Sequence, residues 1–194
     1  RRKGAAIAER VEEYLGLGAE LNVLPFTTVI LPPEIVEAPR YRSVCFHPSL
    51  LPAFRGGAAL TWQIIQGATE SGISIFQPDE GVDTGPLYLQ QGGVPIDPAD
   101  TMASLYFDKL YPMGVEGMVD TVAAIAAGTA TLTPQAVEGA SVQGLVDDAV
   151  ARIDLGASLE AVDGLIRGCD PSPGAWLELE GEPIRLFGCA IESG

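Results

Sequence analysis

The sequence predicts an α/β fold with a mostly parallel sheet, followed by the start of a small β-rich unit. Two observations carry this prediction. Apolar runs of strand length alternate with segments of helical periodicity as far as residue 133, and the pattern changes after that point. The chain has 194 residues, 47% hydrophobic and 19% charged, which is enough apolar material for a core and unlike a disordered composition.

The individual elements follow from apolar spacing and from the residues that begin and end them. Glycines such as Gly67 and Gly128 end helices, prolines begin the short helix at 32–36, and Asp100 or Thr101 caps the long one. Strands are expected at residues 21–26, 43–46, 73–76 and 87–90, and helices at 5–15, 32–36, 58–66 and 100–128, the last bending near Pro112.

The pattern after Thr133 indicates a second unit. We expect a catalytic domain over residues 1–133, a linker over 134–150 and the start of a β-rich domain over 151–194. Within the last of these, the expected elements are a strand at 151–155, an amphipathic helix at 159–167, and a hairpin of strands 176–180 and 183–187.

Charge and cysteine content narrow the possible partners. The formal net charge is −15, from 26 acidic and 11 basic residues, and such a surface repels phosphate backbones and anionic membranes. The sequence therefore argues against a nucleic-acid or membrane partner, although a salty habitat also favours acidic surfaces. Three cysteines without a CxxC pair, and no apolar stretch after the basic start, predict reduced thiols in a cytoplasmic protein. Because the first residue is not Met, we expect the natural N-terminus to lie upstream.

Two polar segments are expected to meet in one crevice. His47, the single histidine, follows strand 43–46, and the loop 79–85 follows strand 73–76. In α/β sheets, ligands bind at the carboxyl ends of the strands. A lone histidine is more often structural than catalytic. This one, however, ends a strand, precedes the rigid Pro48 and faces a carboxylate-rich loop, where its neutral-range titration suits proton transfer.

The loop 79–85 permits three interpretations. Its carboxylates, Asp79, Glu80 and Asp83, are of the type that binds hard cations, but they show no repeated ligand spacing. A solvated loop is the plainer interpretation. The third is a single functional carboxylate, Asp83, fixed by the turn that Gly81 and Gly85 allow, which is the position needed to orient a histidine.

Other candidates carry weaker signals. Cys45 is interpreted as a core cysteine, since no base is evidently paired with it as a nucleophile would require. Arg55 is either an anchor for an anion or a loop, or a partner in an ordinary salt bridge. No dinucleotide fingerprint or P-loop is present, so nicotinamide and ATP chemistry gain no support.

The two segments together resemble the formyltransferase family that uses 10-formyltetrahydrofolate. One half of its signature corresponds to His47-Pro48-Ser49-Leu50-Leu51-Pro52 with Arg55-Gly56, and the other to the run from Asp79 to Gly85, at the family's spacing. The segments 18–26, 166–170 and 173–176 are most similar to the hydrolase branch, typified by the N-terminal domain of 10-formyltetrahydrofolate dehydrogenase. The resemblance implies a Rossmann-like domain whose first strands are missing here and a barrel-like C-terminal domain.

The resemblance also implies site roles. His47 would stabilise or protonate the oxyanion formed at the formyl carbon, Asp83 would hold His47 and assist proton movement, and Ser74 would be a supporting hydroxyl. The pterin pocket would be walled by four residues, Phe26, Ile30, Leu31 and Val82. The formyl donor would be 10-formyltetrahydrofolate, with no metal and no nicotinamide bound by this chain.

One departure from the family bears on the reaction. Transferases of the family usually have an asparagine two residues before the histidine, where it donates to the formyl oxygen; here Cys45 stands there. Loss of one such donor costs about 10²–10³ in rate. This favours hydrolysis of 10-formyltetrahydrofolate, or formyl transfer to a tethered carrier, over fast transfer to an amine. The alternatives are a methionyl-tRNA formyltransferase and an inactive folate-binding module.

Overall fold

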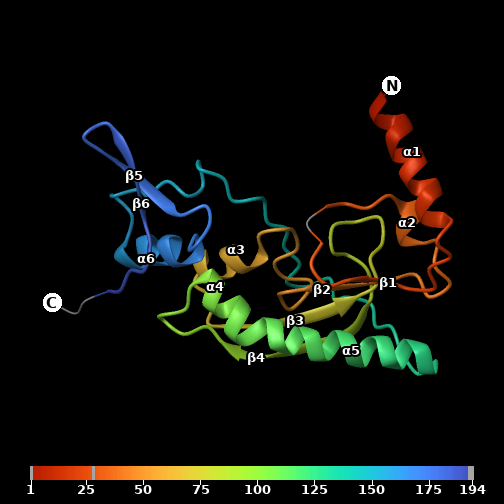
Figure 1. The fold of residues 1–194 in the computed structure, drawn as a ribbon. Helices are drawn as coiled ribbons and strands as arrows, with labels where there is room; N and C mark the ends of the chain where they lie inside the picture. The colour runs from red at the N-terminus through yellow and green to blue at the C-terminus, as the bar shows by residue number, and fades with distance from the viewer. Residues whose placement is uncertain (1, 28, 192–194) are drawn as a thin grey trace.

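The computed structural model describes residues 2–27 and 29–191. Its first part is built on a four-stranded sheet in the order β1-β2-β3-β4 (Figure 1). The strands are β1 (Asn22–Leu24), β2 (Ser43–His47), β3 (Glu70–Phe76) and β4 (Leu87–Pro95). All four lie where the apolar runs predict strands, although β1 is shorter than expected and β3 and β4 are longer.

The sheet is mixed. β1 pairs with β2 in parallel, whereas β3 is antiparallel to both β2 and β4. Three strands, β1, β2 and β4, therefore run in one direction and β3 runs against them. The predicted α/β class with mostly parallel strand directions is confirmed, but in the described residues only β1 and β2 are parallel neighbours. β3 and β4 are joined by a loop without a crossover helix, and such a connection allows only antiparallel pairing.

One face of the sheet is covered by helix α5 (Tyr111–Ala127), which lies along it in Figure 1. A side chain at Gly114 would come within 2.4 Å of the Phe46 ring, and one at Gly117 would come within 3.3 Å of Ile73. The two glycines let the helix approach the strands closely. The contact forms the main core, whose buried members include Val44, Phe46, Ile73, Ile75, Leu105, Leu110 and Met118.

The opposite face of the sheet carries the polar side chains. Successive residues of a strand point to opposite faces, so Cys45 and His47 face away from Val44 and Phe46. His47 lies directly opposite Ser74 in the antiparallel pairing of β2 with β3. Strand alternation therefore places the predicted catalytic residue on the side that α5 leaves open.

The helices agree with the sequence signals except in one detail. The described helices before residue 134 are α1 (Arg2–Leu15), α2 (Pro33–Val36), α3 (Ala59–Ile65), α4 (Met102–Ser104), the π-helix η1 (Leu105–Leu110) and α5. Thr101 caps α4 in a capping box with Ser104, and Gly128 ends α5 with φ 69°. The sequence predicts a bend near Pro112; the structure has the π-helix η1 directly before α5, and Pro112 lies in the first turn of α5, where proline is tolerated. In the described part of the chain, no helix is both long and apolar enough to span a bilayer.

The last part of the chain has a small core of its own. Helix α6 (Leu159–Gly168) and the hairpin β5 (Ala175–Leu179) with β6 (Glu182–Leu186) enclose Ala151, Ile153, Ile166, Cys169 and Ala175. The strand predicted at 151–155 is wrong. That segment forms a turn in which Ala151 and Ile153 are buried and Leu155 is exposed. It pairs with β5 through a single bridge from Arg152 to Trp176. The predicted domain boundaries stay a prediction.

Candidate active site

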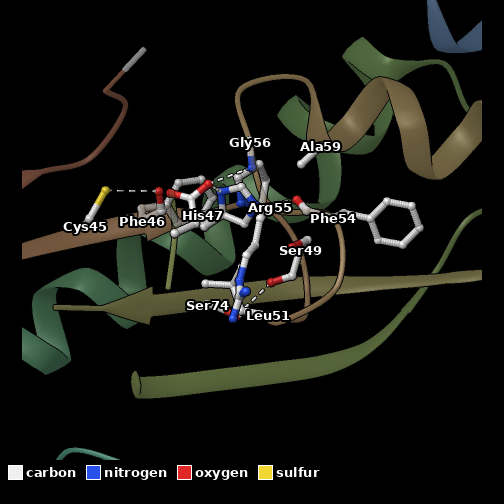
Figure 2. Close-up of polar contacts among 12 residues, drawn as sticks. Cys45, Phe46, His47, Ser49, Leu51, Phe54, Arg55, Gly56, Ala59 and Ser74 are labelled. Carbon is white, nitrogen blue, oxygen red and sulfur yellow. Dashed lines mark hydrogen bonds and ion pairs between the residues drawn. The ribbon is translucent and has the colours of Figure 1, made fainter. Parts of the chain in front are cut away.

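His47 ends β2 and is almost entirely buried, with 6% of its surface exposed. Its Nε2 lies 2.8 Å from the carbonyl oxygen of Phe54. A carbonyl oxygen only accepts hydrogen bonds, so Nε2 carries the hydrogen and donates it. In the neutral ring, Nδ1 is then the unprotonated nitrogen. The loop that follows His47 therefore fixes both the orientation and the tautomer of the ring (Figure 2).

Asp83 approaches the free nitrogen of that ring. Its Oδ2 lies 3.6 Å from Nδ1 of His47 and accepts a 2.8 Å hydrogen bond from the backbone N–H of Gly56. The backbone of Asp83 has φ 52°, a left-handed conformation that is uncommon for a residue with a side chain. One carboxylate oxygen thus contacts both the histidine and its loop, as the spacing of the two motifs predicts.

The rest of the 79–85 loop holds its own shape. The carboxylate of Asp79 accepts hydrogen bonds from the Gly81 N–H and the Thr84 hydroxyl. A side chain at Gly85 would lie 1.8 Å from the carbonyl oxygen of Gln77, so this position requires glycine. Asp79 therefore closes the loop, which leaves Asp83 as the carboxylate that contacts His47.

Burial controls the protonation of the site. Loss of solvent lowers the pKa of His47, and the negative charge of Asp83 and the Phe54 carbonyl oppose that shift. Burial, with the charge of Asp83 added, raises the pKa of Cys45 to about 12. Cys45 is therefore a neutral thiol at physiological pH, and its Sγ contacts the carbonyl oxygen of Phe46 at 3.7 Å. It is poorly suited to act as a nucleophile.

A cavity of about 260 Å³ opens beside the pair. Of the residues that the resemblance assigns to a pterin pocket, Ile30, Leu31 and Val82 line it, together with Cys45, His47 and Asp83. Phe26 does not line it. Phe26 instead borders a second cavity, of about 400 Å³, and its ring packs 5.7 Å from that of Tyr106. The two cavities share His47, Gly56 and Gly57, so they meet at the histidine.

Ser74 lies behind the site and does not line either cavity. Its fully buried hydroxyl donates to the carbonyl oxygen of Ser49 at 2.8 Å and accepts from the Leu51 N–H at 3.1 Å (Figure 2). The side-chain amide of Gln90 donates to Ser74 Oγ and to the Leu51 carbonyl oxygen. These bonds attach the loop after His47 to strands β3 and β4.

The apolar residues of the signature also serve that loop. Leu51 is buried, and Leu50 packs over Gly72 and Gly92; an added Cβ would collide with it at Gly72, at 2.6 Å, and would be in tight contact at Gly92, at 3.3 Å. Pro52 accepts a backbone hydrogen bond from Ser141. None of the three lines either cavity described above. Their structural contribution is therefore to hold the loop that carries the Phe54 carbonyl.

Arg55 forms no ion pair with the described residues. Its guanidinium donates to Oε1 of Gln135 at 2.7 Å. Its buried Nε has no hydrogen-bond partner among the described residues. It borders a third hollow with Thr84 and Gln135, outside the cavity beside His47. The contact with Gln135 anchors the loop, whereas the role of Arg55 as an anchor for an anion stays a prediction.

Three contributions to the site were not predicted: the Gly56 N–H, the Phe54 carbonyl oxygen and the side chain of Gln135. The first two come from the backbone, and only the position of Gly56 directly after Arg55 in the signature pointed to them. Gln135 lies in the predicted linker, where the sequence carries no motif. Together, the residues provide a buried histidine with a free nitrogen, a fixed carboxylate beside it and an adjoining cavity, which is an arrangement suited to proton transfer.

The comparisons with known proteins agree with this geometry. The family described as formyl transferase matches residues 1–122, and the formyl transferase C-terminal domain matches residues 146–194. This chain belongs to the formyl transferase family.

This formyl transferase chain is similar to proteins of two kinds, among others. It is 43% identical over 193 residues to the cytosolic 10-formyltetrahydrofolate dehydrogenase of Mus musculus, covering 100% of this chain and 21% of that protein. It is 35% identical over 187 residues to a methionyl-tRNA formyltransferase of Ruegeria pomeroyi, covering 96% of this chain and 61% of that protein. The chain thus spans about a fifth of the length of the dehydrogenases that it matches.

Solved structures share the fold of this formyl transferase chain. HypX from Aquifex aeolicus, in complex with tetrahydrofolic acid, superposes with a TM-score of 0.79 at 23% identity, over 91% of this chain and 30% of that one. Methionyl-tRNA formyltransferase from Clostridium thermocellum gives a TM-score of 0.72 at 21% identity, over 94% and 77% of the two chains.

Proposed function

We propose that this chain binds 10-formyltetrahydrofolate and removes its formyl group by hydrolysis or by transfer to a carrier, with His47 and Asp83 as the catalytic pair. The observation that carries the proposal is the contact of one Asp83 oxygen with both Nδ1 of His47 and the Gly56 N–H, beside a cavity. The resemblance of both loops to formyltransferases, and the 43% identity to a 10-formyltetrahydrofolate dehydrogenase, support the choice of substrate.

The geometry suits a simple hydrolysis. Water adds to the formyl carbon as its proton passes to Nδ1 of His47, the nitrogen left free by the Phe54 contact. The imidazolium formed is stabilised by the carboxylate of Asp83 and in turn stabilises the oxyanion. The bond from carbon to N10 then breaks, and N10 takes a proton from the imidazolium. Formic acid and tetrahydrofolate are the products, and His47 is neutral again.

The side of approach favours a small or uncharged acceptor. The second cavity reaches His47 without contacting Val82 or Asp83, and none of the described residues that line it is Asp, Glu, Lys or Arg. Water or a slender neutral arm fits such a lining better than an anionic acceptor does. The net charge of −15 also opposes a phosphate-rich partner.

Methionyl-tRNA formylation is the second candidate, and the 35% identity to a Ruegeria pomeroyi methionyl-tRNA formyltransferase favours it. A shift of initiator tRNA on a native gel at low salt would support this candidate, and absence of a shift would exclude it.

Because the relatives include both cytosolic and mitochondrial proteins, the cytoplasmic location stays a prediction.

Formate release from 10-formyltetrahydrofolate tests the main proposal. Measurements compare the unmodified chain with His47→Ala, Asp83→Asn and the control Asp120→Asn, which changes an exposed carboxylate on α5. We expect both site variants to lose activity by about 10²–10⁴, the usual contribution of acid–base catalysis, and the control to keep it. Release at the unmodified rate by His47→Ala would refute the catalytic pair. Binding of 5-formyltetrahydrofolate without any release would instead indicate a folate-binding module.

A further inference from the structure

The side chain of Gln135 lies between the two loops that make up the candidate site. Its Nε2 donates to the carbonyl oxygens of Asp83, at 2.8 Å, and Gly85, at 2.7 Å. Its Oε1 accepts from the guanidinium of Arg55 at 2.7 Å. One side chain from the predicted linker thus contacts the loop 79–85, called here the aspartate loop, directly. Through Arg55 it also contacts the loop 48–57 after His47, called the histidine loop.

The chemistry of these contacts is specific for an amide. Two carbonyl oxygens need a group with two N–H donors, and a guanidinium needs an acceptor. The negative charge of a carboxylate would repel both carbonyl oxygens. An apolar side chain would leave the two carbonyl oxygens and the Arg55 guanidinium without this hydrogen-bond partner. The orientation of the Gln135 amide is therefore determined by its neighbours.

The aspartate loop needs support from outside. Asp83 is held at φ 52°, a backbone conformation that costs free energy on the order of 1–3 kcal/mol for a residue other than glycine. The contacts of Asp79 are confined to the loop itself. Gln135 binds the backbone on both sides of Thr84, including the carbonyl of Asp83 itself.

The backbone before Gln135 fixes its place. Thr133 pairs with Leu87 at the start of β4 through two hydrogen bonds, of 2.8 and 2.9 Å. This pairing places the next residues beside the loop that leads into β4. The linker is thereby attached to the strand that follows the aspartate loop, and Gln135 points back at that loop.

We propose that Gln135 is a positioning residue for the reaction: its amide holds the Asp83 carboxylate against His47 and ties the aspartate loop to the histidine loop through Arg55. The role rests on the proposed function of the site, because it concerns the same catalytic pair. Gln135 touches neither cavity beside His47, so it acts through Asp83 and not on the substrate.

The single histidine of the chain gives a test that needs no substrate. The ring of His47 is titrated by NMR in the unmodified chain, in Gln135→Met, in Asp83→Asn and in the double variant. Charged or titratable groups near the ring are Asp83, Asp79 across the same cavity, the neutral thiol of Cys45 and Arg55 on the adjoining loop. The Gln135→Met change alters none of these charges.

The expected result is a double-mutant cycle that is not additive. Since the Asp83 charge raises the pKa of His47, both single variants should move the midpoint to lower pH. In the Asp83→Asn background, Gln135→Met should change it no further. The proposal is overturned if Gln135→Met leaves the midpoint unchanged, or if it causes the same shift with and without Asp83. Should Gln135→Met fail to fold, Gln135→Asn, which is one methylene too short to reach all three partners, decides by the same criteria.

Turnover gives the second readout. Misplacement of a catalytic group by about 1 Å can cost on the order of 10² in rate. We expect Gln135→Met to lower kcat by about 10- to 100-fold. Gln143→Met changes an amide in the same segment whose side chain, among the described residues, hydrogen-bonds to Gln66 alone, at 3.5 Å, and kcat should stay within about twofold. A kcat for Gln135→Met equal to that of Gln143→Met contradicts the positioning role. If no protein releases formate but the titrations follow the cycle, the proposed function fails and the positioning role stands.

Discussion

The backbone N–H of Gly56 donates to Oδ2 of Asp83 over 2.8 Å and joins the two halves of the site across 27 positions of sequence. The same oxygen faces Nδ1 of His47 at 3.6 Å. The carboxylate is thus oriented by a backbone group before any substrate is bound. This kind of preorganisation is what proton transfer in a buried site requires.

Substitution of Gly56 by alanine should disturb both stability and activity. Gly56 has φ 102°, and an added Cβ would lie 2.5 Å from the carbonyl oxygen of Gln143, so the loop must move. We expect Gly56→Ala to lower the free energy of unfolding by about 1–3 kcal/mol and to reduce formate release. Denaturant unfolding and initial rates measure the two effects. Gly144→Ala, where an added Cβ meets no atom within 4 Å, is the matched control and should change neither.

The pH dependence of stability should reveal the burial of His47. Because the pKa of His47 in the folded chain lies below its usual value of 6.5, the unfolded chain binds a proton first as the pH falls. Above pH 6.5 the ring is neutral in both states, and the contribution of its burial to the free energy of unfolding is fully present. Below pH 6.5 that free energy falls by about 1.4 kcal/mol per pH unit until the pH reaches the folded-state pKa of His47.

The comparison that isolates this effect is between the unmodified chain and His47→Gln. The two proteins differ only at residue 47, so the difference in stability isolates the contribution of the His47 ring and of its contact with Asp83. Denaturant unfolding between pH 5 and 8 should show the unmodified chain losing stability relative to the variant at the acidic end. A constant difference across this range would mean that the folded and unfolded pKa values of His47 are equal.

Cys45 offers a test of the missing donor. It lines the cavity beside His47 at the position where transferases of the family have asparagine. An oxyanion donor contributes about 10²–10³ in rate. Cys45→Asn should therefore raise the single-turnover rate of formyl loss. We expect a gain of about 10- to 100-fold, below the full contribution of such a donor, because the surrounding loops are not adjusted to an asparagine. Cys45→Ala removes the thiol without adding a donor and should give no gain; equal rates for the two variants would exclude the idea.

Local signals in the sequence were sufficient for most of the fold. Apolar spacing located the four strands of the main sheet, and strand alternation with the two polar segments brought His47 and Asp83 together. The strand expected at 151–155 failed for a physical reason: Ala151 and Ile153 are buried by α6 and β5 while their backbone forms a turn. An apolar pattern indicates burial, and it does not distinguish a strand from a turn that pairs with β5 through one bridge at Arg152.

The supporting residues of the site were beyond sequence reasoning. The Phe54 carbonyl and the Gly56 N–H belong to the backbone, which every residue has, so only the folded loop selects them. Gln135 is 52 positions from Asp83 in a segment without a motif. Phe26 borders a different cavity from Ile30, Leu31 and Val82, a separation that the apolar stretch before it does not specify.

The junction between the main sheet and the C-terminal unit should be sensitive to the size of one residue. Helix α6 packs on α3 through Gly168, where an added Cβ would lie 2.9 Å from the carbonyl oxygen of Thr61 and from the side chain of Ile65. Backbone cannot yield as a flexible side chain does, so the two helices must separate. We expect Gly168→Ala to lower the free energy of unfolding by about 1–3 kcal/mol, the usual cost of overpacking.

The separation should also reach the second cavity, because Ser172 and Pro173, shortly after α6, line it together with the N-terminal part of α3. Gly168→Ala should therefore weaken the use of any acceptor larger than water, while hydrolysis at saturating folate, which depends on His47 and Asp83, changes less. Urea unfolding and a comparison of the two reactions measure this. Equal loss of hydrolysis and transfer would show that the acceptor does not approach along the junction.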